Sequence, residues 1–515
     1  MAEPHDMGGC AMTKPSGLYA CVYAREFPAQ AMLRLRPELR HLPCVVMEGE
    51  PPLQFVCSRN GKASLLGVAH GMTQVEIDTF PSVTALSRSR KEEVMAKSAL
   101  LECAGMFSPR VEDRSNGYTF LCVVDIAGTE SLFGPPLSLA KDLLQCVQEL
   151  SVAASIAVSS NFHAAICLAR GQSARMEVSV IPYGEERLAL ARLRLTVLDL
   201  SEEDAETLSL WGIHTLGMLG ELPEKALIAR MGQEGKRLRQ LARGESPHLF
   251  LPVEPGFTLE ERIELDSPVE LLDSLLFVVG VMLEQLVLRA AARIFVLASV
   301  TIALSLEGDE THTRMVRPAL PTNDRQLWLK LIHLDLEAHP PQAAIVSLTL
   351  SAEPGTTSKV QLGLFSPQLP EPGRLDVTLA RIRAIVGEEC VGSAVLKDTH
   401  EPGAFGMEPF SVPSTSPEYV PVRQQCIAIR QIRPMENVSV SLQDKRPVSF
   451  FFREKRYLVE QAYGPWAMSG EWWNQALWSY QQWDLVARSH AGALLCCCLA
   501  YERTRDCWQM VALYD

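Results

Sequence analysis

Two strand-like stretches near the beginning of the chain could bring carboxylates together. The first reads "GLYACVYAREF", and the second reads "GYTFLCVVDIAG" and ends its apolar run on Asp125. Carboxylates on neighbouring strands can hold the two hard divalent cations that activate a hydroxyl for phosphoryl transfer. The apolar runs themselves contain no acid, and Glu26, Glu112 and Asp113 only flank them. Metal chemistry would therefore need ligands supplied from loops, where carboxylates are usually solvated surface groups.

Composition narrows the class of protein. A chain of 515 residues predicts several domains, and its formal net charge of −13 argues against coating nucleic acid by bulk charge, although a local basic groove stays possible. None of the 14 cysteines forms a Cys-x-x-Cys pair, and we expect neither a metal site nor a cofactor. The start resembles no signal peptide, and the run "LLFVVGVMLEQLVL" is too short to span a bilayer. We expect a cytoplasmic protein that contacts no membrane.

The elements that must position these residues change in character along the chain. Strands and helices alternate over 15–180, which predicts a mixed sheet with helices packed on it. Helices alone follow over 181–250, and an α+β unit covers 251–365. Residues 366–445 are rich in Pro, Gly and Ser and read as a partly extended linker, whereas 446–515 hold six of the eight tryptophans and read as a β-rich module. The fold class is multidomain α+β.

This order resembles the Y-family translesion DNA polymerases. The strings "LLGVAHGM", "AASIAVSSNFHAAICLARG" and "LWGIHTLGMLGELP" are similar to the family's "KFGVRSGM", its strand and helix "SIGIAPNKFLAKIASD", and its thumb. The resemblance implies a palm with fingers at about 26–75 inside the first domain. It also implies a helix-hairpin-helix thumb over 181–250 and a little finger over 251–365.

The resemblance also identifies where catalytic carboxylates are missing. The family carries them in "DMDAFF" and "SIDEAYLD". On this chain the first pair falls on Val22 and Ala24, and the second pair falls on Phe120 and Leu121 when aligned through the final Leu-Asp. In that first alignment Asp125 matches only the structural aspartate at the end of the strand, and an alignment from "SPRVE" instead places the second pair at 117–118, again without an acid.

The contacts to the incoming triphosphate are missing as well. The family's "SYEARKFG" supplies a Tyr and an Arg for that purpose. The corresponding "NGKASLLG" has Gly61 and Ser64 at those places, and Lys62 is the only cation nearby. The frame of a polymerase is thus expected without its metal ligands and without its triphosphate clamp.

The chain combines a polymerase-like fold that lacks the metal ligands with a long C-terminal extension. This combination resembles the ImuB-type subunits of the bacterial mutasome. The strings "GPWAMSGEWWNQALWSYQQWDLVAR" and "VALYD" are similar to the C-terminal part of that group. The resemblance implies a non-catalytic adaptor in SOS mutagenesis that recruits an error-prone C-family polymerase and a RecA-like accessory protein. An active Y-family polymerase with relocated ligands and a general DNA-repair scaffold remain the alternatives.

The motif "QLGLF" is the sharpest positive signal. It resembles the pentapeptide by which bacterial proteins bind the replicative sliding clamp. Leu364 and Phe365 can enter an apolar pocket, Gln361 can form hydrogen bonds at its rim, and Leu362 adds a smaller contact. The alternative is an edge strand whose Leu and Phe belong to the core.

The helical module predicts contact with DNA. Turns between its helices can offer backbone amides to phosphate, and a basic stretch follows them. The expected DNA-binding residues are Gly212, Gly235, Lys236, Arg237 and Arg239. Binding through phosphates would be weak, independent of base sequence and sensitive to salt. A solvated basic helix face explains the same cations. The tryptophans of the tail can similarly form a compact core or a surface for a partner.

Overall fold

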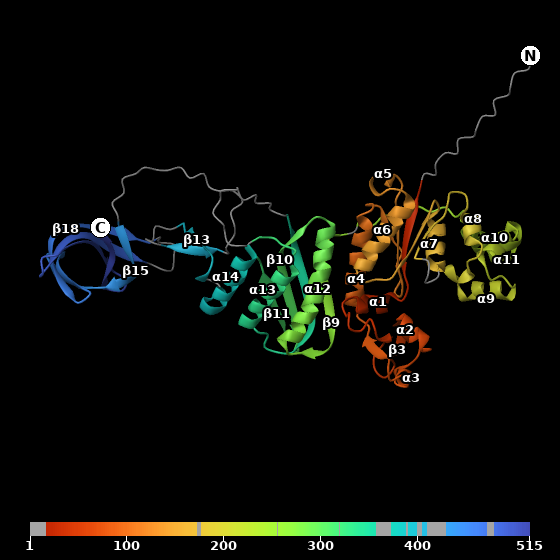
Figure 1. Ribbon diagram of the computed structural model, residues 1–515, viewed down its shortest axis with the longest axis horizontal. Coiled ribbons are helices and arrows are strands. Elements are labelled where there is room, and N and C mark those ends of the chain that lie inside the picture. The colour runs from red at the N-terminus through yellow and green to blue at the C-terminus, as the bar shows by residue number, and fades with distance from the viewer. Residues whose placement is uncertain are drawn as a thin grey trace, which may run out of the picture. The chain divides into compact units, whose positions relative to one another are not determined.

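The structure is a computed structural model, and it describes residues 17–172, 177–254, 256–308, 310–318, 320–356, 372–387, 390–398, 404–408, 429–470 and 478–514. The chain forms two compact units, residues 1–384 and 385–515, and each is described by itself. Figure 1 labels many of the helices and several strands of the two units. The described part of the first unit contains three sheets and one helical module, and that of the second contains a β-rich domain.

A five-stranded sheet forms the centre of the first domain. Its strand order is β5-β6-β1-β7-β8, and β1 pairs antiparallel with both β6 and β7. The strands are β1 (Tyr19–Ala24), β5 (Val111–Asp113), β6 (Phe120–Asp125), β7 (Ser155–Ser159) and β8 (Val178–Val180). The sheet is antiparallel except where β8 runs parallel to β7, which agrees with the mixed sheet expected from the sequence.

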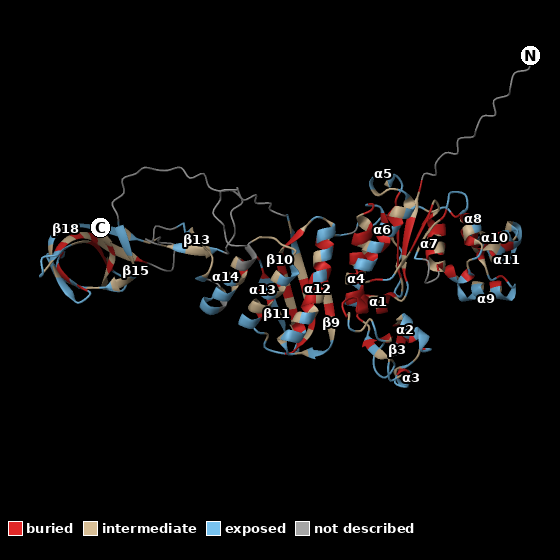
Figure 2. Ribbon diagram, in the orientation of Figure 1, coloured by how far each residue is buried: buried red, intermediate tan, exposed pale blue. Residues whose placement is uncertain are grey.

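Helices cover the sheet on both faces. Helices α4 (Arg90–Gly105) and α6 (Pro136–Glu149) bury one face, and α7 (Phe162–Gly171) packs on the other. Figure 2 shows the strands of this sheet in the colour of buried residues. A short helix, α5 (Glu130–Phe133), precedes α6.

A small domain interrupts the chain between β1 and α4. It contains a three-stranded sheet with the order β3-β2-β4 and three helices. Its elements are α1 (Phe27–Arg34), β2 (Cys44–Glu48), β3 (Phe55–Arg59), α2 (Gly61–Leu65), α3 (Gln74–Ile77) and β4 (Thr84–Ser87). Helix α2 begins where the Asn60 side chain accepts a hydrogen bond from the Ala63 amide, the usual role of asparagine at a helix start. The domain reaches β4, beyond the boundary near residue 75 expected from the sequence.

The next module is helical in its described residues, as its sequence predicts. It contains α8 (Glu186–Leu190), α9 (Glu202–Leu210), α10 (Leu216–Glu221) and α11 (Glu224–Arg243). The Ser201 hydroxyl accepts a hydrogen bond from the Asp204 amide at the start of α9. Leucines from these helices form one core with Ala164 and Cys167 of α7, so the module packs directly on the first domain.

The third domain is an α+β unit. Its four-stranded sheet has the order β11-β10-β12-β9, and its helices pack on one face. The elements are β9 (Leu259–Val269), α12 (Leu272–Ala292), β10 (Val296–Leu306), β11 (Thr311–Val316), α13 (Arg325–Ala338) and β12 (Ile345–Gly355). Trp328 of α13 is fully buried in this core, where its indole N–H donates to the Thr322 carbonyl at 3.0 Å.

Helix α12 is longer than its most apolar stretch, which was expected to be too short for a membrane span. The helix has 21 residues and is long and apolar enough to cross a membrane by length and composition alone. Half of the apolar window is buried inside the protein, and Leu275, Met282 and Leu286 pack on the sheet. The apolar character of α12 is thus that of a core helix.

The second unit contains two sheets. A hairpin pairs β13 (Ser393–Leu396) with β14 (Phe405–Glu408), and α14 (Pro372–Val386) crosses the division between the units. The larger sheet has the order β15-β21-β20-β19-β18-β17-β16, with Phe450, Trp483 and Met510 in its core. Its strands are β15 (Ile429–Asn437), β16 (Ser439–Gln443), β17 (Arg446–Phe452), β18 (Lys455–Ser469), β19 (Ser479–Ser489), β20 (Leu494–Glu502) and β21 (Cys507–Tyr514).

The β-rich module therefore begins earlier than its sequence indicates. The predicted boundary at 446 coincides with the start of β17, whereas β15 and β16 already belong to the same sheet. Trp483 is buried and Trp466 is about half exposed, so the tryptophans of the described part divide between core and surface.

Candidate functional site

The register of the central strands decides which side chains could have formed a metal site. Val22 lies opposite Cys122, Tyr23 opposite Leu121, and Ala24 opposite Phe120. Residues opposite each other on paired strands point to the same face of the sheet, and the face alternates along each strand. Val22, Ala24 and Phe120 belong to the core beneath α4 and α6, with exposed fractions of 1%, 0% and 0%.

This placement corrects the register of the sequence alignment. Three of the four positions assigned to catalytic carboxylates point into a closed core, where no substrate could reach them. Only Leu121 lies on the face that α7 packs against. Aligning the family string "DMDAFF" on its first Phe, at Phe27, moves the two aspartate positions to Tyr23 and Arg25. In this register, too, no acid stands on the first strand.

A cavity of about 460 Å³ lies beside these two residues. Its wall includes Tyr23, Arg25 and Glu26 from the end of β1, together with His70 and Tyr118. Gly117 and Tyr118, the alternative positions for the second pair of acids, lie in the turn before β6. The cavity lies where the resemblance to Y-family polymerases would place the catalytic centre, and among the described residues its only carboxylate is Glu26.

Arg25 places a cation where the second aspartate would stand. Its guanidinium donates to the carbonyl oxygens of Arg170 at 2.9 Å and Gln172 at 2.7 Å. These carbonyls lie at the end of α7, where the helix dipole favours a positive charge. Arg25 therefore has a structural role and would repel a divalent cation.

The carboxylate of Glu26 is already hydrogen-bonded to other groups of the protein. Its carboxylate accepts hydrogen bonds from the Ser58 hydroxyl at 2.9 Å and the Arg59 amide at 3.0 Å, and it pairs with His70 at 2.8 Å. The residue has a left-handed backbone with φ of 50°. Glu26 thus joins β1 to the small domain, and a metal ion would have to displace these partners.

The acids before β6 are engaged in the same way. Glu112 is 3% exposed, pairs with His248 at 2.9 Å and accepts the Leu251 amide at 2.8 Å. Asp113 pairs with Lys97. Burial alone would raise the pKa of Asp113, but the hydrogen bonds from Lys97 and Ser115 outweigh it and lower the pKa. Among the residues that the structure describes, no group of three or more His, Cys, Asp or Glu could hold a metal ion.

The positions of the triphosphate contacts are now placed in the small domain. Gly61 and Ser64 lie in α2, which borders β2 and β3. Lys62 donates to the His41 carbonyl at 2.7 Å, so its ammonium group is turned to the protein backbone. The loss of the triphosphate contacts at these positions stays a prediction from the sequence.

The two glycines that were expected to contact DNA lie in different backbone surroundings, one in a turn and one inside a helix. Gly212 follows α9 and has a left-handed backbone with φ of 70°, as a turn requires. Gly235 lies inside α11, where an added Cβ would approach the Leu227 carbonyl oxygen to 2.9 Å. The turn in α11 is at Gly232, with φ of 64° and ψ of −148°. The string "MGQEG" contains both glycines, and the expected phosphate contact at Gly235 stays a prediction.

The expected basic side chains are paired with acids. Lys236 and Arg239 lie 3.6 Å and 3.3 Å from Glu224, and Arg237 pairs with Glu234 one turn away. These pairs are partly exposed, so they are weak and a phosphate could compete for the cations. DNA binding by this module stays a prediction.

A cavity of about 400 Å³ separates the β5–β6 turn, α7 and α11. His163 lines it together with Arg114, Arg170 and Arg237. Burial, reinforced by His248, Arg114 and Arg237, lowers the pKa of His163 to about 4. His163 is therefore neutral at physiological pH, and no local sequence pattern identifies it as a cavity residue.

The motif "QLGLF" lies outside the described residues. Gln361, Leu362, Leu364 and Phe365 fall between β12 and α14, in the stretch 357–371. The contact of this motif with a clamp stays a prediction from its sequence.

Comparison with known proteins now gives the family. Residues 22–170 match the IMS model, described as the impB/mucB/samB family. Protein ImuB of Caulobacter vibrioides is 25% identical over 421 residues, which cover 76% of this chain and 85% of that protein. DNA polymerase IV of Moorella thermoacetica is 27% identical over 237 residues, covering 45% of this chain and 58% of that protein. The solved structure of DinB from Sulfolobus solfataricus aligns at 15% identity over 66% of this chain and 99% of that chain, with a TM-score of 0.41.

Residues 22–170, which include most of the five-stranded sheet, therefore match an impB/mucB/samB-type domain, as expected of a Y-family polymerase-like protein. The similarity that continues over most of the chain is to protein ImuB, at 25% identity, and it supports an ImuB-type protein. The expectation drawn from the sequence strings is confirmed at this level.

Proposed function

We propose that the protein is a non-catalytic adaptor for damage-induced mutagenesis and translesion synthesis. In this role it binds the sliding clamp and recruits an error-prone C-family polymerase and a RecA-like accessory protein. It works in the cytoplasm on damaged DNA, whose backbone it contacts weakly and without sequence preference. Its similarity to ImuB over most of the chain supports the assignment.

One observation carries the non-catalytic role. Tyr23 near the end of β1 and Arg25 just after it line the cavity, and Arg25 donates to carbonyl oxygens at the end of α7. Two-metal phosphoryl transfer needs carboxylates at this place, because hard cations require oxygen ligands with negative charge. A guanidinium within the site contributes the opposite charge.

The alternative of an active polymerase with relocated ligands has less support. Glu26, Glu112 and Asp113 are the acids that could have moved into the site, and each is bonded to other protein groups. Glu112 is nearly inaccessible, and releasing it would leave His248 without its carboxylate partner. A metal ion would have to compensate for the loss of all these contacts.

The clamp assignment rests on the chemistry of "QLGLF". Two adjacent apolar anchors, preceded by an amide, fit a preformed apolar pocket with a polar rim. The second unit, with its partly exposed tryptophan Trp466, is proposed as the region that recruits the partner proteins.

Primer extension tests the absence of catalysis. The purified full chain is incubated with primed template, nucleotides and either Mg²⁺ or Mn²⁺, beside an active Y-family polymerase. We expect no metal-dependent extension. Extension that requires the divalent ion and persists through purification would establish the alternative.

A pull-down with the sliding clamp tests the motif. Leu364→Ala with Phe365→Ala removes both anchors, each worth about 2 kcal/mol. Binding should weaken at least about thirtyfold, since 1.4 kcal/mol corresponds to a factor of ten. Val360→Ala with Leu369→Ala is the matched control, because it shortens two apolar residues of the same segment outside the motif. Equal loss in both variants would refute the motif.

A further inference from the structure

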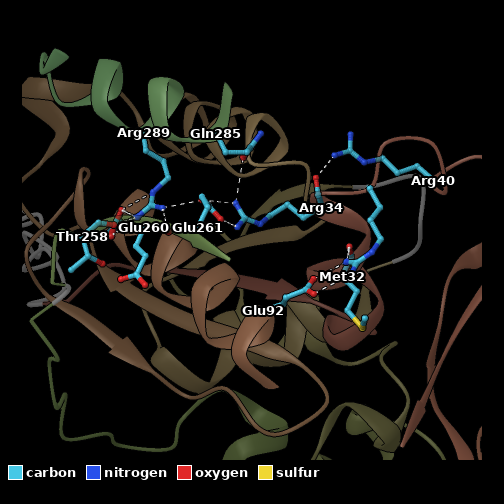
Figure 3. Close-up of polar contacts among 11 residues, drawn as sticks. Met32, Arg34, Arg40, Glu92, Thr258, Glu260, Glu261, Gln285 and Arg289 are labelled. Carbon is cyan, nitrogen blue, oxygen red and sulfur yellow. Dashed lines mark hydrogen bonds and ion pairs between the residues drawn. The ribbon is translucent and has the colours of Figure 1, made fainter. Parts of the chain in front are cut away.

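A cluster of buried charges joins the α+β domain to the rest of the first unit. Arg34 of α1 and Glu261 of β9 form an ion pair whose side chains are 2% and 0% exposed. Arg289 of α12 pairs with the same Glu261 at 2.9 Å and with Glu102 of α4 at 2.7 Å. Figure 3 shows Arg34, Glu261 and Arg289 in one line of polar contacts, with Gln285 beside Arg34.

The four charged groups balance and come from both sides of a domain boundary. Arg34 and Glu102 belong to the polymerase-like part, whereas Glu261 and Arg289 belong to the α+β domain. Arg289 donates to both carboxylate oxygens of Glu102. It also donates to the backbone carbonyl of Glu260. Removal of one charge would leave the others uncompensated in a region without solvent.

A second buried pair extends the contact along β9. Arg36, just after α1, donates to both oxygens of Glu92 in α4, at 2.7 Å and 3.1 Å. Glu92 also accepts the backbone amide of Glu264 at 2.9 Å, and Arg36 donates to the Glu264 carbonyl at 2.5 Å. The backbone of β9 is thus bonded directly to α4 through these two side chains.

The linker before β9 is hydrogen-bonded to the first domain as well. The Leu251 amide donates to Glu112 at 2.8 Å, and the Val253 amide donates to the Val111 carbonyl at 2.7 Å. The Thr258 amide donates to Glu102 at 3.1 Å, which connects the linker with the charge cluster. A chain that had to let two domains swing would lack such a series of backbone contacts.

We propose that the α+β domain is locked on the polymerase-like domain and that the two move as one rigid body. The lock consists of the charge cluster of Arg34, Glu261, Arg289 and Glu102, and of the linker amides at 251, 253 and 258. A protein that presents a clamp motif and a docking frame needs a fixed geometry between them, whereas a polymerase must move along DNA. The inference does not depend on which partner is recruited.

Hydrogen–deuterium exchange of the full chain tests the lock. Peptides that cover residues 246–265 report the linker amides and β9. In the wild-type protein we expect these amides to exchange at least about a hundredfold more slowly than an unstructured chain, equivalent to about 2.7 kcal/mol. Exchange at the rate of an unstructured chain would overturn the proposal.

Paired substitutions separate the lock from general destabilisation. Arg34→Met leaves Glu261 and Glu102 with a single arginine, and it should raise linker exchange at least about tenfold. Arg34→Met with Glu261→Met leaves the neutral pair Arg289–Glu102, so this double variant should exchange more slowly than Arg34→Met alone. Additive effects of the two changes would show that the charges are not coupled.

The control breaks a pair within the α+β domain. Arg314→Met removes the contact to Asp335, whose side chains are 21% and 15% exposed. Linker exchange should stay at the wild-type rate in this variant. If Arg314→Met and Arg34→Met accelerate the linker equally, the effect is loss of domain stability and the lock is refuted.

Discussion

The two faces of the central sheet allow a matched test of which strand positions border the cavity and which belong to the core. Val22 and Tyr23 are neighbours on β1, but Val22 is 1% exposed beneath the helices whereas Tyr23 borders a cavity. Substituting aspartate at each position places the same carboxylate on opposite faces. The comparison holds the strand, its pairing and the introduced group constant.

The structure gives the two substitutions very different costs. Val22→Asp loses about 2 kcal/mol of apolar burial. It must also bury a carboxyl group among apolar neighbours, where the pKa is raised so far that the group is protonated, and holding it neutral costs roughly 4 kcal/mol at neutral pH. The total is comparable to the whole stability of a domain, about 5–15 kcal/mol. Tyr23→Asp loses part of a half-buried ring, at about 1–3 kcal/mol, and Arg170 lies 6.0 Å from that ring to favour the new charge.

Urea denaturation followed by circular dichroism measures both variants. We expect Tyr23→Asp to unfold cooperatively at a modestly lower midpoint. Val22→Asp should be aggregated or lack a folded baseline. Equal tolerance of the two variants would refute the assignment of faces and restore Val22 as a position that reaches solvent. Neither variant should gain primer extension, because Arg25, Gly61 and Ser64 remain.

Three further predictions concern other parts of the chain. The pKa of His163 is lower in the folded state than in the unfolded state, so its contribution to stability is complete above about pH 6.5 and is lost as the pH falls toward 4. We expect His163→Phe to reduce the pH dependence of the unfolding free energy by about 1–2 kcal/mol, after allowance for solvent screening. Gly235→Ala should lower the Tm, because the added methyl group would lie 2.9 Å from the Leu227 carbonyl oxygen. The same change at a solvated helix position would raise the Tm. An unchanged or higher Tm, measured by calorimetry, would contradict this packing. A chain that ends at residue 428 should be monodisperse in size-exclusion chromatography. A chain that ends at residue 447 should aggregate, because it retains β15 and β16 without β21. The opposite result would contradict the start of the C-terminal sheet at β15.

The order of domains could be predicted from the sequence because it depends on local patterns. The alternation of strands and helices up to residue 180 and the helical module after it need only periodicity and turn residues. The register of β1 could not be predicted in the same way. A shift by one residue moves every side chain to the other face, and a degenerate motif without carboxylates does not fix the shift.

The partners of the acids were beyond sequence reasoning for a different reason. Glu112 meets His248 and Glu261 meets Arg34 across more than a hundred residues of chain. The start of the C-terminal sheet was missed likewise, because Ile429 pairs with Tyr514 at the other end of the module. Such contacts are decided by the assembled fold and leave no local periodicity.

The strand order of the C-terminal sheet has a consequence for how it can be recognised. β15 and β16 are consecutive in the chain, separated by Val438, yet they form the two opposite edges of the sheet. The sheet therefore curls until its edges meet, and Figure 1 shows it as a ring. A closed ring offers few free backbone groups to an extended peptide, so extension by an added strand is disfavoured. If this sheet binds a partner, side chains on the outer wall are then the expected contacts, and a β-strand mimic could approach only the seam between β15 and β16.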